Sequence, residues 1–187
     1  FLISCGPGQR VSFVLDVLIP RSDHLCPVIL RGDMCWGTIA EPIADEMQKR
    51  GYIVAQFNRL ELGPDNANRT IGIYAAFPNT QAGSLAAWAW GYHRAVDFLI
   101  TLPEVDKSKI AITGLSRGGK AVLLAGATDD RVALTNPNAS GTGGAAPFRF
   151  QTPKDESLGA ITHHFPFWFG SNFINGDDDA NPNKLHF

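Results

Sequence analysis

The chain has 187 residues, of which 44% are hydrophobic and 18% are charged. This composition is that of a folded globular domain and argues against a disordered segment. A formal net charge of −2 gives no support for a nucleic-acid or anionic-membrane partner, and no apolar run reaches the length of a membrane span. We therefore expect residues 1–187 to form a single domain, with no nucleic acid and no membrane among its partners.

The first half of the chain predicts strands around one helix. Loose alternation of apolar residues predicts a strand over 11–19, and short apolar runs predict buried strands over 27–32 and 51–57. Apolar residues at helical spacing predict a helix over 39–50. The stretch 58–81 is dense in Gly, Pro and Asn and predicts a long irregular surface loop.

The second half continues the alternation of helices and strands. Apolar spacing predicts a helix over 84–102, a strand over 110–113, a helix over 120–128 and a strand over 131–135. Strands and helices that alternate in this way predict a mostly parallel sheet with helices on both faces. Beyond Pro137 no clear periodicity remains.

Trp88, Trp90 and Tyr92 lie close together on the helix predicted over 84–102. Neighbouring aromatic residues can form a platform that stacks on sugars. However, Trp88 and Tyr92 are four residues apart and share one helix face, which favours a place in the hydrophobic core.

The cysteines and histidines show no metal-binding pattern. Cys5, Cys26 and Cys35 have neither C-x-x-C nor zinc-ligand spacing, and the histidines are scattered. Asp177–Asp179 lack the glycine and the distal glutamate of a calcium loop. We expect no metal and no cofactor, while the disulfide status of the three cysteines stays open.

The segment Gly114-Leu115-Ser116-Arg117-Gly118 is a G-x-S-x-G motif between a predicted strand and a predicted helix. In this context the motif is typical of a nucleophile elbow, in which a sharp turn presents the serine in a strained backbone conformation. The following helix would aim its free N–H groups and its positive dipole end at the oxygen that becomes negative during acyl transfer. The alternative is a Gly-rich turn whose serine only caps the helix.

Five segments of the chain together resemble the glucuronoyl esterases, carbohydrate esterase family fifteen. The segments are AWAWG (87–91), GLSRGGK (114–120), AGATDDRVALT (125–135), SGTGGAA (140–146) and FPFWF (165–169), with Asn172-Phe173 completing the last one. The resemblance implies a three-layer α/β/α sandwich of the α/β-hydrolase type. It also implies hydrolysis of the ester that joins (4-O-methyl-)glucuronate of xylan to lignin alcohols, through an acyl-enzyme.

The resemblance also implies roles for individual residues. Ser116 would be the nucleophile, Arg117 would stabilise the oxyanion, and Lys120 would bind sugar hydroxyls from one helical turn further on. Glu156 falls on a glutamate that lines the sugar pocket in bacterial members, although Asp155 replaces the glycine before it. Because a lignin–carbohydrate substrate cannot enter a cell, we expect a secreted or periplasmic protein.

Two features depart from the family pattern. Many members carry a catalytic glutamate directly before the SGTGGAA-like loop, where this chain has Ala139. In α/β-hydrolases the catalytic histidine follows the acid. His163 and His164 fall where the family has no catalytic histidine, and His186 lies in a polar acidic tail. We therefore expect residues 1–187 to be the N-terminal and central portion of a larger catalytic domain.

Two other functions stay open at this stage. Another α/β-hydrolase esterase, such as an acetyl-xylan esterase, or an acyl-peptidase would keep Ser116 as nucleophile but give Lys120 no sugar to bind. A non-catalytic sugar-binding relative would explain Ala139 and the absence of a well-placed histidine. The oligomeric state and the alcohol portion of the substrate cannot be deduced from the sequence.

Overall fold

A computed structural model of the chain describes residues 1–147, 152 and 155–170. Its sheet has six strands in the order β1-β2-β4-β3-β5-β6. Strands β3, β4, β5 and β6 are mutually parallel, whereas β1 and β2 are antiparallel to their neighbours. The strands are β1 (Leu2–Cys5), β2 (Val11–Leu18), β3 (Cys26–Arg31), β4 (Ile53–Phe57), β5 (Val105–Leu115) and β6 (Val132–Asn138).

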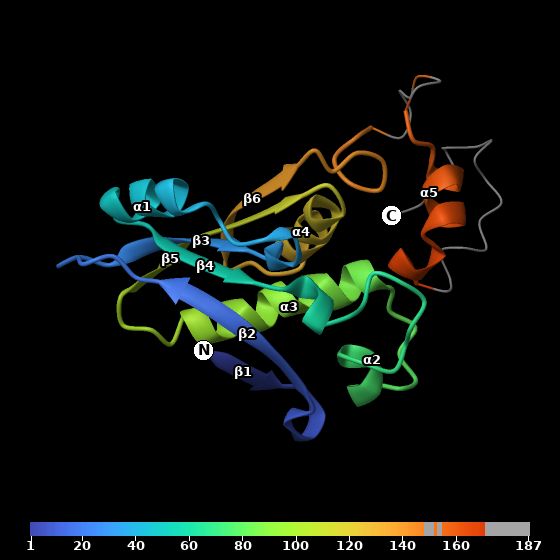
Figure 1. Cartoon of the computed structure of the whole chain (residues 1–187), viewed down its shortest axis with the longest axis horizontal. Coiled ribbons are helices and arrows are strands. Elements are labelled where there is room, and N and C mark those ends of the chain that lie inside the picture. The colour runs from blue at the N-terminus through green and yellow to red at the C-terminus, as the bar shows by residue number, and fades with distance from the viewer. Residues whose placement is uncertain (148–151, 153–154, 171–187) are drawn as a thin grey trace.

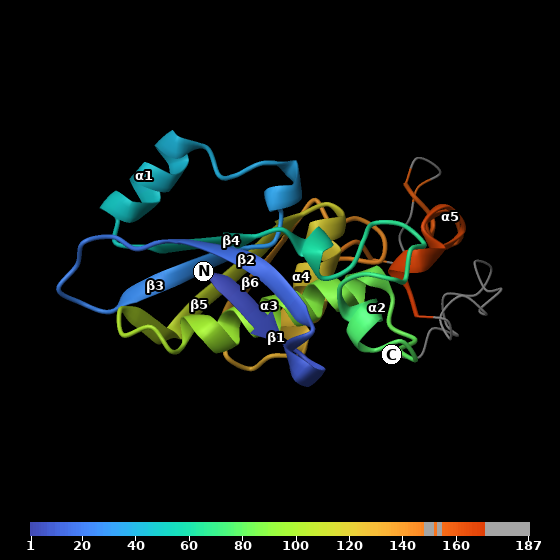
Figure 2. The ribbon, with the colours of Figure 1, turned by 60° about the horizontal axis from the view of Figure 1, so that its bottom comes forward.

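Helices cover both faces of this sheet. Helix α1 lies on one face, and α3 and α4 lie on the other (Figures 1 and 2). This arrangement is the three-layer α/β/α sandwich expected from the sequence. The helices are α1 (Glu41–Lys49), α2 (Ile73–Ala76), α3 (Ser84–Leu99), α4 (Arg117–Ala127) and α5 (Leu158–His164).

The core lies between the sheet and the α3–α4 layer. Every residue of β4 is buried, as expected for a strand covered on both faces. Trp88 and Tyr92 of α3 are both fully buried, which confirms that they are core residues. Their polar atoms are satisfied, because Trp88 Nε1 donates to the Gly63 carbonyl at 2.7 Å and the Tyr92 hydroxyl donates to the Thr113 carbonyl at 3.0 Å.

Several predicted boundaries are wrong. Strand β1 was missed because only four residues form this half-exposed edge strand. Strand β5 is longer than predicted, because Val105 pairs with Cys26 of β3 and the polar residues between Val105 and Ile110 form an irregularity in the register. Helix α3 ends at Leu99 instead of 102.

The regions predicted to lack regular structure contain short helices. A 3₁₀ turn at Arg59–Glu61 and helix α2 interrupt the predicted loop over 58–81, and α5 follows Pro137. Each is seven residues or shorter, too short to show a helical period in the sequence. Cys5, Cys26 and Cys35 all carry free thiols. Across the described residues, no helix combines the length and apolar character that a membrane span needs.

Candidate active site

Ser116 occupies the sharp turn between β5 and α4. Its backbone has φ 55° and ψ −120°, a left-handed conformation that a serine adopts only when its surroundings impose it. The Ser116 N–H donates to the Asn138 carbonyl of β6 at 3.0 Å, and the Ser116 carbonyl accepts from the Lys120 N–H at 3.1 Å. The residue itself is exposed. The predicted strained turn with an accessible serine is therefore confirmed.

The first turn of α4 begins directly after Ser116. Because the first N–H groups of a helix have no partners within the helix, they can donate to an anion beside Ser116. Gly114 and Gly118 let the strand and the helix approach, since a Cβ on Gly114 would collide with the Gly118 carbonyl. The elbow can thus stabilise negative charge with backbone dipoles alone.

Arg117 is half-buried, with one acidic and two aromatic partners. Its Nη1 donates to Asp65 Oδ2 at 2.5 Å, and its guanidinium lies 4.9 Å from the centre of the Trp168 ring and 5.3 Å from that of Phe165. Its Nε is buried and has no hydrogen-bond partner among the described residues. The guanidinium, on the residue that follows Ser116, is therefore held by Asp65 and the two rings, and its Nε–H is not engaged by any described residue.

Asp65 also fixes the aromatic neighbour of Arg117. Trp168 Nε1 donates to Asp65 Oδ1 at 2.7 Å, so one carboxylate accepts hydrogen bonds from both residues. The Trp168 ring stacks on Phe165 with 4.0 Å between centres and 6° between planes. Asp65 thereby connects the loop after β4 to the segment that follows α5.

Lys120 is buried, with 6% of its surface exposed. Its ammonium donates to the Ser140 carbonyl at 2.6 Å and to the Thr142 carbonyl, and it lies 5.9 Å from the centre of the Trp168 ring. Burial lowers the pKa of Lys120 below its usual range, while the negative charge of Glu156 acts in the opposite direction. Two of its three N–H donors are thus committed to the loop after β6.

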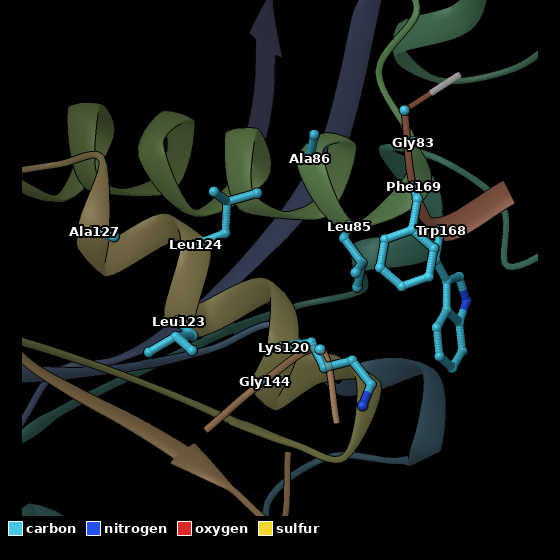
Figure 3. A pocket seen from close by; sticks show the side chains of 12 residues that line it. Gly83, Leu85, Ala86, Lys120, Leu123, Leu124, Ala127, Gly144, Trp168 and Phe169 are labelled. Carbon is cyan, nitrogen blue, oxygen red and sulfur yellow. The ribbon is translucent and has the colours of Figure 1, made fainter. Parts of the chain in front are cut away.

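A cavity of about 550 Å³ opens beside Lys120. Its wall is mostly apolar: Leu85 comes from α3, Leu124 from α4, and Trp168 and Phe169 from the segment after α5 (Figure 3). Figure 3 shows the Lys120 chain and the two aromatic rings at the same end of the cavity. At this end the Lys120 ammonium lies beside apolar rings, a combination that is typical of small-molecule binding sites.

The structure brings together most of the residues predicted from sequence. Ser116, Arg117 and Lys120 share the start of α4, and the charge of the exposed Glu156 reaches Lys120. His163 and His164 are exposed on α5. His186, Asp177–Asp179, Asn172 and Phe173 lie outside the described residues.

Ala139, at the position of the family glutamate, follows β6 and has φ 45°.

In the part of the chain that the structure describes, no group of three or more His, Cys, Asp or Glu side chains could hold a metal ion.

Three residues that contact the elbow or Arg117 were not identified from the sequence. Asp65 and Asp33 each lie in a loop after a strand, and Asp33 Oδ2 accepts from the N–H of Leu115, the residue before Ser116, at 2.8 Å. A single acidic residue after a strand has no distinguishing pattern in the sequence. Trp168 belongs to the FPFWF segment, whose resemblance to the family is the one sequence signal that points to this part of the site.

A mixed α/β/α sandwich with a serine at a strand–helix elbow defines the α/β-hydrolase class of serine hydrolases. Within this class, a sequence profile of the family described as "Glucuronyl esterase, fungi" matches residues 4–185. The chain therefore belongs to the glucuronoyl esterase family.

Individual relatives agree with this assignment. The chain is 32% identical over 183 residues to a 4-O-methyl-glucuronoyl methylesterase of Phanerochaete carnosa, covering 90% of this chain and 43% of that protein. It is 38% identical over 147 residues to a carbohydrate esterase of an unknown prokaryotic organism, covering 73% of this chain and 34% of the relative. The chain thus spans less than half the length of these relatives.

Solved structures show the same likeness. A carbohydrate esterase family 15 glucuronoyl esterase from Caldicellulosiruptor kristjansonii superposes with a TM-score of 0.78 at 30% identity, covering 91% of this chain and 52% of that one. A Sporotrichum thermophile glucuronoyl esterase, a serine-to-alanine mutant in complex with methyl 4-O-methyl-beta-D-glucopyranuronate, superposes with a TM-score of 0.67 at 30% identity. That match covers 87% of this chain and 45% of the other.

Proposed function

We propose that the whole protein is a serine esterase that hydrolyses esters of glucuronate or 4-O-methyl-glucuronate. The observation that carries the proposal is the strained, exposed Ser116 at the start of α4, with Arg117 and Lys120 beside it, in a chain of this family. The relatives named above carry this activity in their names. A xylan side group esterified to a lignin alcohol is the proposed natural substrate.

In the proposed reaction, Ser116 Oγ attacks the ester carbonyl and loses its proton to a general base. The resulting oxyanion accepts hydrogen bonds from the first N–H groups of α4 and from Arg117. The C–O bond to the alcohol then breaks, and the alcohol leaves with the proton that the general base took from Ser116. Water then attacks the acyl-enzyme, which releases the glucuronate as a free acid and restores Ser116. We assign the general base to a histidine other than His163 and His164, because they lie directly before Phe165-Pro166, where the resemblance to the family gives no catalytic histidine.

Lys120 is proposed to bind a substrate hydroxyl. An ammonium has three N–H donors, and the Ser140 and Thr142 carbonyls accept two of them. The third can reach a sugar oxygen at the mouth of the cavity. Glu156 would assist by accepting from another hydroxyl near Lys120.

Ala139 favours a second candidate function, a sugar-binding relative without catalysis. Alanine cannot orient a histidine, and many family members have a glutamate at this place. One experiment separates the two candidate functions: the whole protein is assayed with a panel of glucuronate and acetyl esters. The esterase proposal predicts turnover of a methyl glucuronate ester well above that of acetylated xylan. Binding of the glucuronate without turnover would favour the second candidate, and preference for acetyl esters would refute both.

We also propose that the protein acts outside the cytoplasm, in the periplasm or after secretion, because its polymeric substrate lies there. Localisation of the full-length protein by cell fractionation tests this. Recovery of active protein only from the cytoplasm would contradict it.

A further inference from the structure

The Asp33 carboxylate continues the sheet where the backbone of β3 ends. The last register pair between β3 and β5 joins Arg31 to Thr113. Two residues further on, the chain at Asp33 turns away into a 3₁₀ turn, with φ −100° and ψ 23°. Asp33 Oδ2 then accepts from the Leu115 N–H at 2.8 Å, so a side chain replaces the missing backbone acceptor. Leu115 is the residue directly before Ser116.

The same carboxylate also touches the other side of the elbow. A Cβ built on Gly118 would collide with Asp33, whose side-chain atoms are the three nearest to that position. Gly118 is in the first turn of α4, where alanine would otherwise be the better helix former. The second glycine of the G-x-S-x-G motif, Gly118, is therefore needed because the Asp33 carboxylate occupies the space that a Cβ would fill.

A buried negative charge beside an oxyanion site needs compensation, because it opposes the charge that develops in the transition state. Arg59 supplies it: its Nη1 pairs with Asp33 Oδ1, and both side chains are 1% exposed. The Arg59 guanidinium lies 4.3 Å from the centre of the Trp36 ring and 4.9 Å from that of Trp88, so aromatic faces hold it in place. Arg31 Nε is more distant, at 4.0 Å from Asp33 Oδ2.

We infer that Asp33 is a positioning residue for the nucleophile. It holds Leu115 on one side of Ser116 and limits the approach of Gly118 on the other, while Arg59 cancels its charge. Its contact with the elbow follows from the geometry alone, whereas its consequence for turnover rests on the function proposed above.

Double variants of the whole protein test this without leaving a buried charge unpaired, which could prevent folding. Asp33→Asn/Arg59→Met keeps an oxygen acceptor and the bulk at position 33, whereas Asp33→Ala/Arg59→Met removes both. Both proteins lack the ion pair, so its loss cancels in the comparison. The inference predicts that the second protein has a kcat about tenfold lower than the first, as for one lost hydrogen bond, with KM changed less than about twofold. Equal kcat values would overturn the inference.

Gly118→Ala, placed in each of the two proteins, tests the steric part. In Asp33→Asn/Arg59→Met the added methyl collides, and the thermal midpoint falls. In Asp33→Ala/Arg59→Met the space is open, and the midpoint stays constant or rises because alanine favours the helix. Equal falls in both proteins would overturn the steric claim. The midpoints can be read even if the protein shows no turnover, so failure of the proposed function and failure of this inference are distinguishable.

Discussion

The Asp65 carboxylate holds two residues of the site in place, so its removal should lower both the free energy of unfolding and the turnover. Its carboxylate accepts from Arg117 Nη1 at 2.5 Å and from Trp168 Nε1 at 2.7 Å. A hydrogen bond to a charged group contributes about 1.5–3 kcal/mol. Trp168 is 3% exposed, so its bond retains that value, whereas the Arg117 side chain is 30% exposed and its pairing is weakened by solvent. Asp65→Ala is therefore expected to lower the free energy of unfolding by about 3 kcal/mol.

Asp65→Asn separates the two contacts. Its amide oxygen can still accept from Trp168 Nε1, but the charge that holds Arg117 is lost, so the expected cost is about 1 kcal/mol. The assay is denaturant unfolding of the whole protein together with turnover of a glucuronate ester. Because Arg117 and Trp168 both lose their support, we expect the kcat of Asp65→Ala to fall by about tenfold or more.

Glu46→Gln serves as the control for Asp65. It breaks an exposed ion pair with Arg50 on α1, far from the site, and should leave both stability and kcat unchanged. If Asp65→Ala and Asp65→Asn were equally stable, or if Asp65→Ala kept the kcat of the unchanged protein, the argument that Asp65 holds Arg117 and Trp168 would be wrong.

Three further changes test separate parts of the account. Arg117→Ala should lower kcat by about 10²–10³, the usual loss for one oxyanion donor, and a change confined to KM would refute this role. Lys120→Met should mainly raise KM for glucuronate esters, because the proposed role of Lys120 is to bind the sugar in ground and transition states alike. A loss of kcat at unchanged KM would contradict that role. Asp129→Asn should reduce stability in a pH-dependent way. The side-chain hydrogen bonds from Arg131 hold the pKa of Asp129 below its usual range, so the stabilisation is complete above the unfolded pKa of about 3.9 and is lost as pH falls through the lower folded value. Urea unfolding at neutral and strongly acidic pH should therefore show a difference between the two proteins only at neutral pH.

Local pattern was sufficient to predict the elbow and most of the sheet. The run before Gly114 is apolar and β-branched, the run after it forms helices, and the G-x-S-x-G motif leaves few conformations between them. Trp88 and Tyr92 were recognisable as core residues because helical spacing is a local property. Strand β1 could not be recognised from the sequence, because it forms a strand only through its pairing with β2.

The partners that hold the site depend on contacts between distant segments. Asp65 and Trp168 are 103 residues apart, and Asp33 and Leu115 are 82 apart. Neither spacing follows from a periodic pattern, so no sequence rule relates them before the fold is known. Lys120 illustrates the same limit, since its place on α4 was predicted but its bonds to the Ser140 and Thr142 carbonyls were not.

The central claim is that Ser116 is the nucleophile of a glucuronate esterase. The most direct test is the initial rate at which the whole protein and its Ser116→Ala variant hydrolyse methyl 4-O-methyl-glucuronate, with circular dichroism to verify that both are folded. The account predicts turnover by the unchanged protein and a loss of about 10⁴-fold or more in the variant, as for other serine nucleophiles. A folded Ser116→Ala variant that hydrolyses the ester at the rate of the unchanged protein would contradict it.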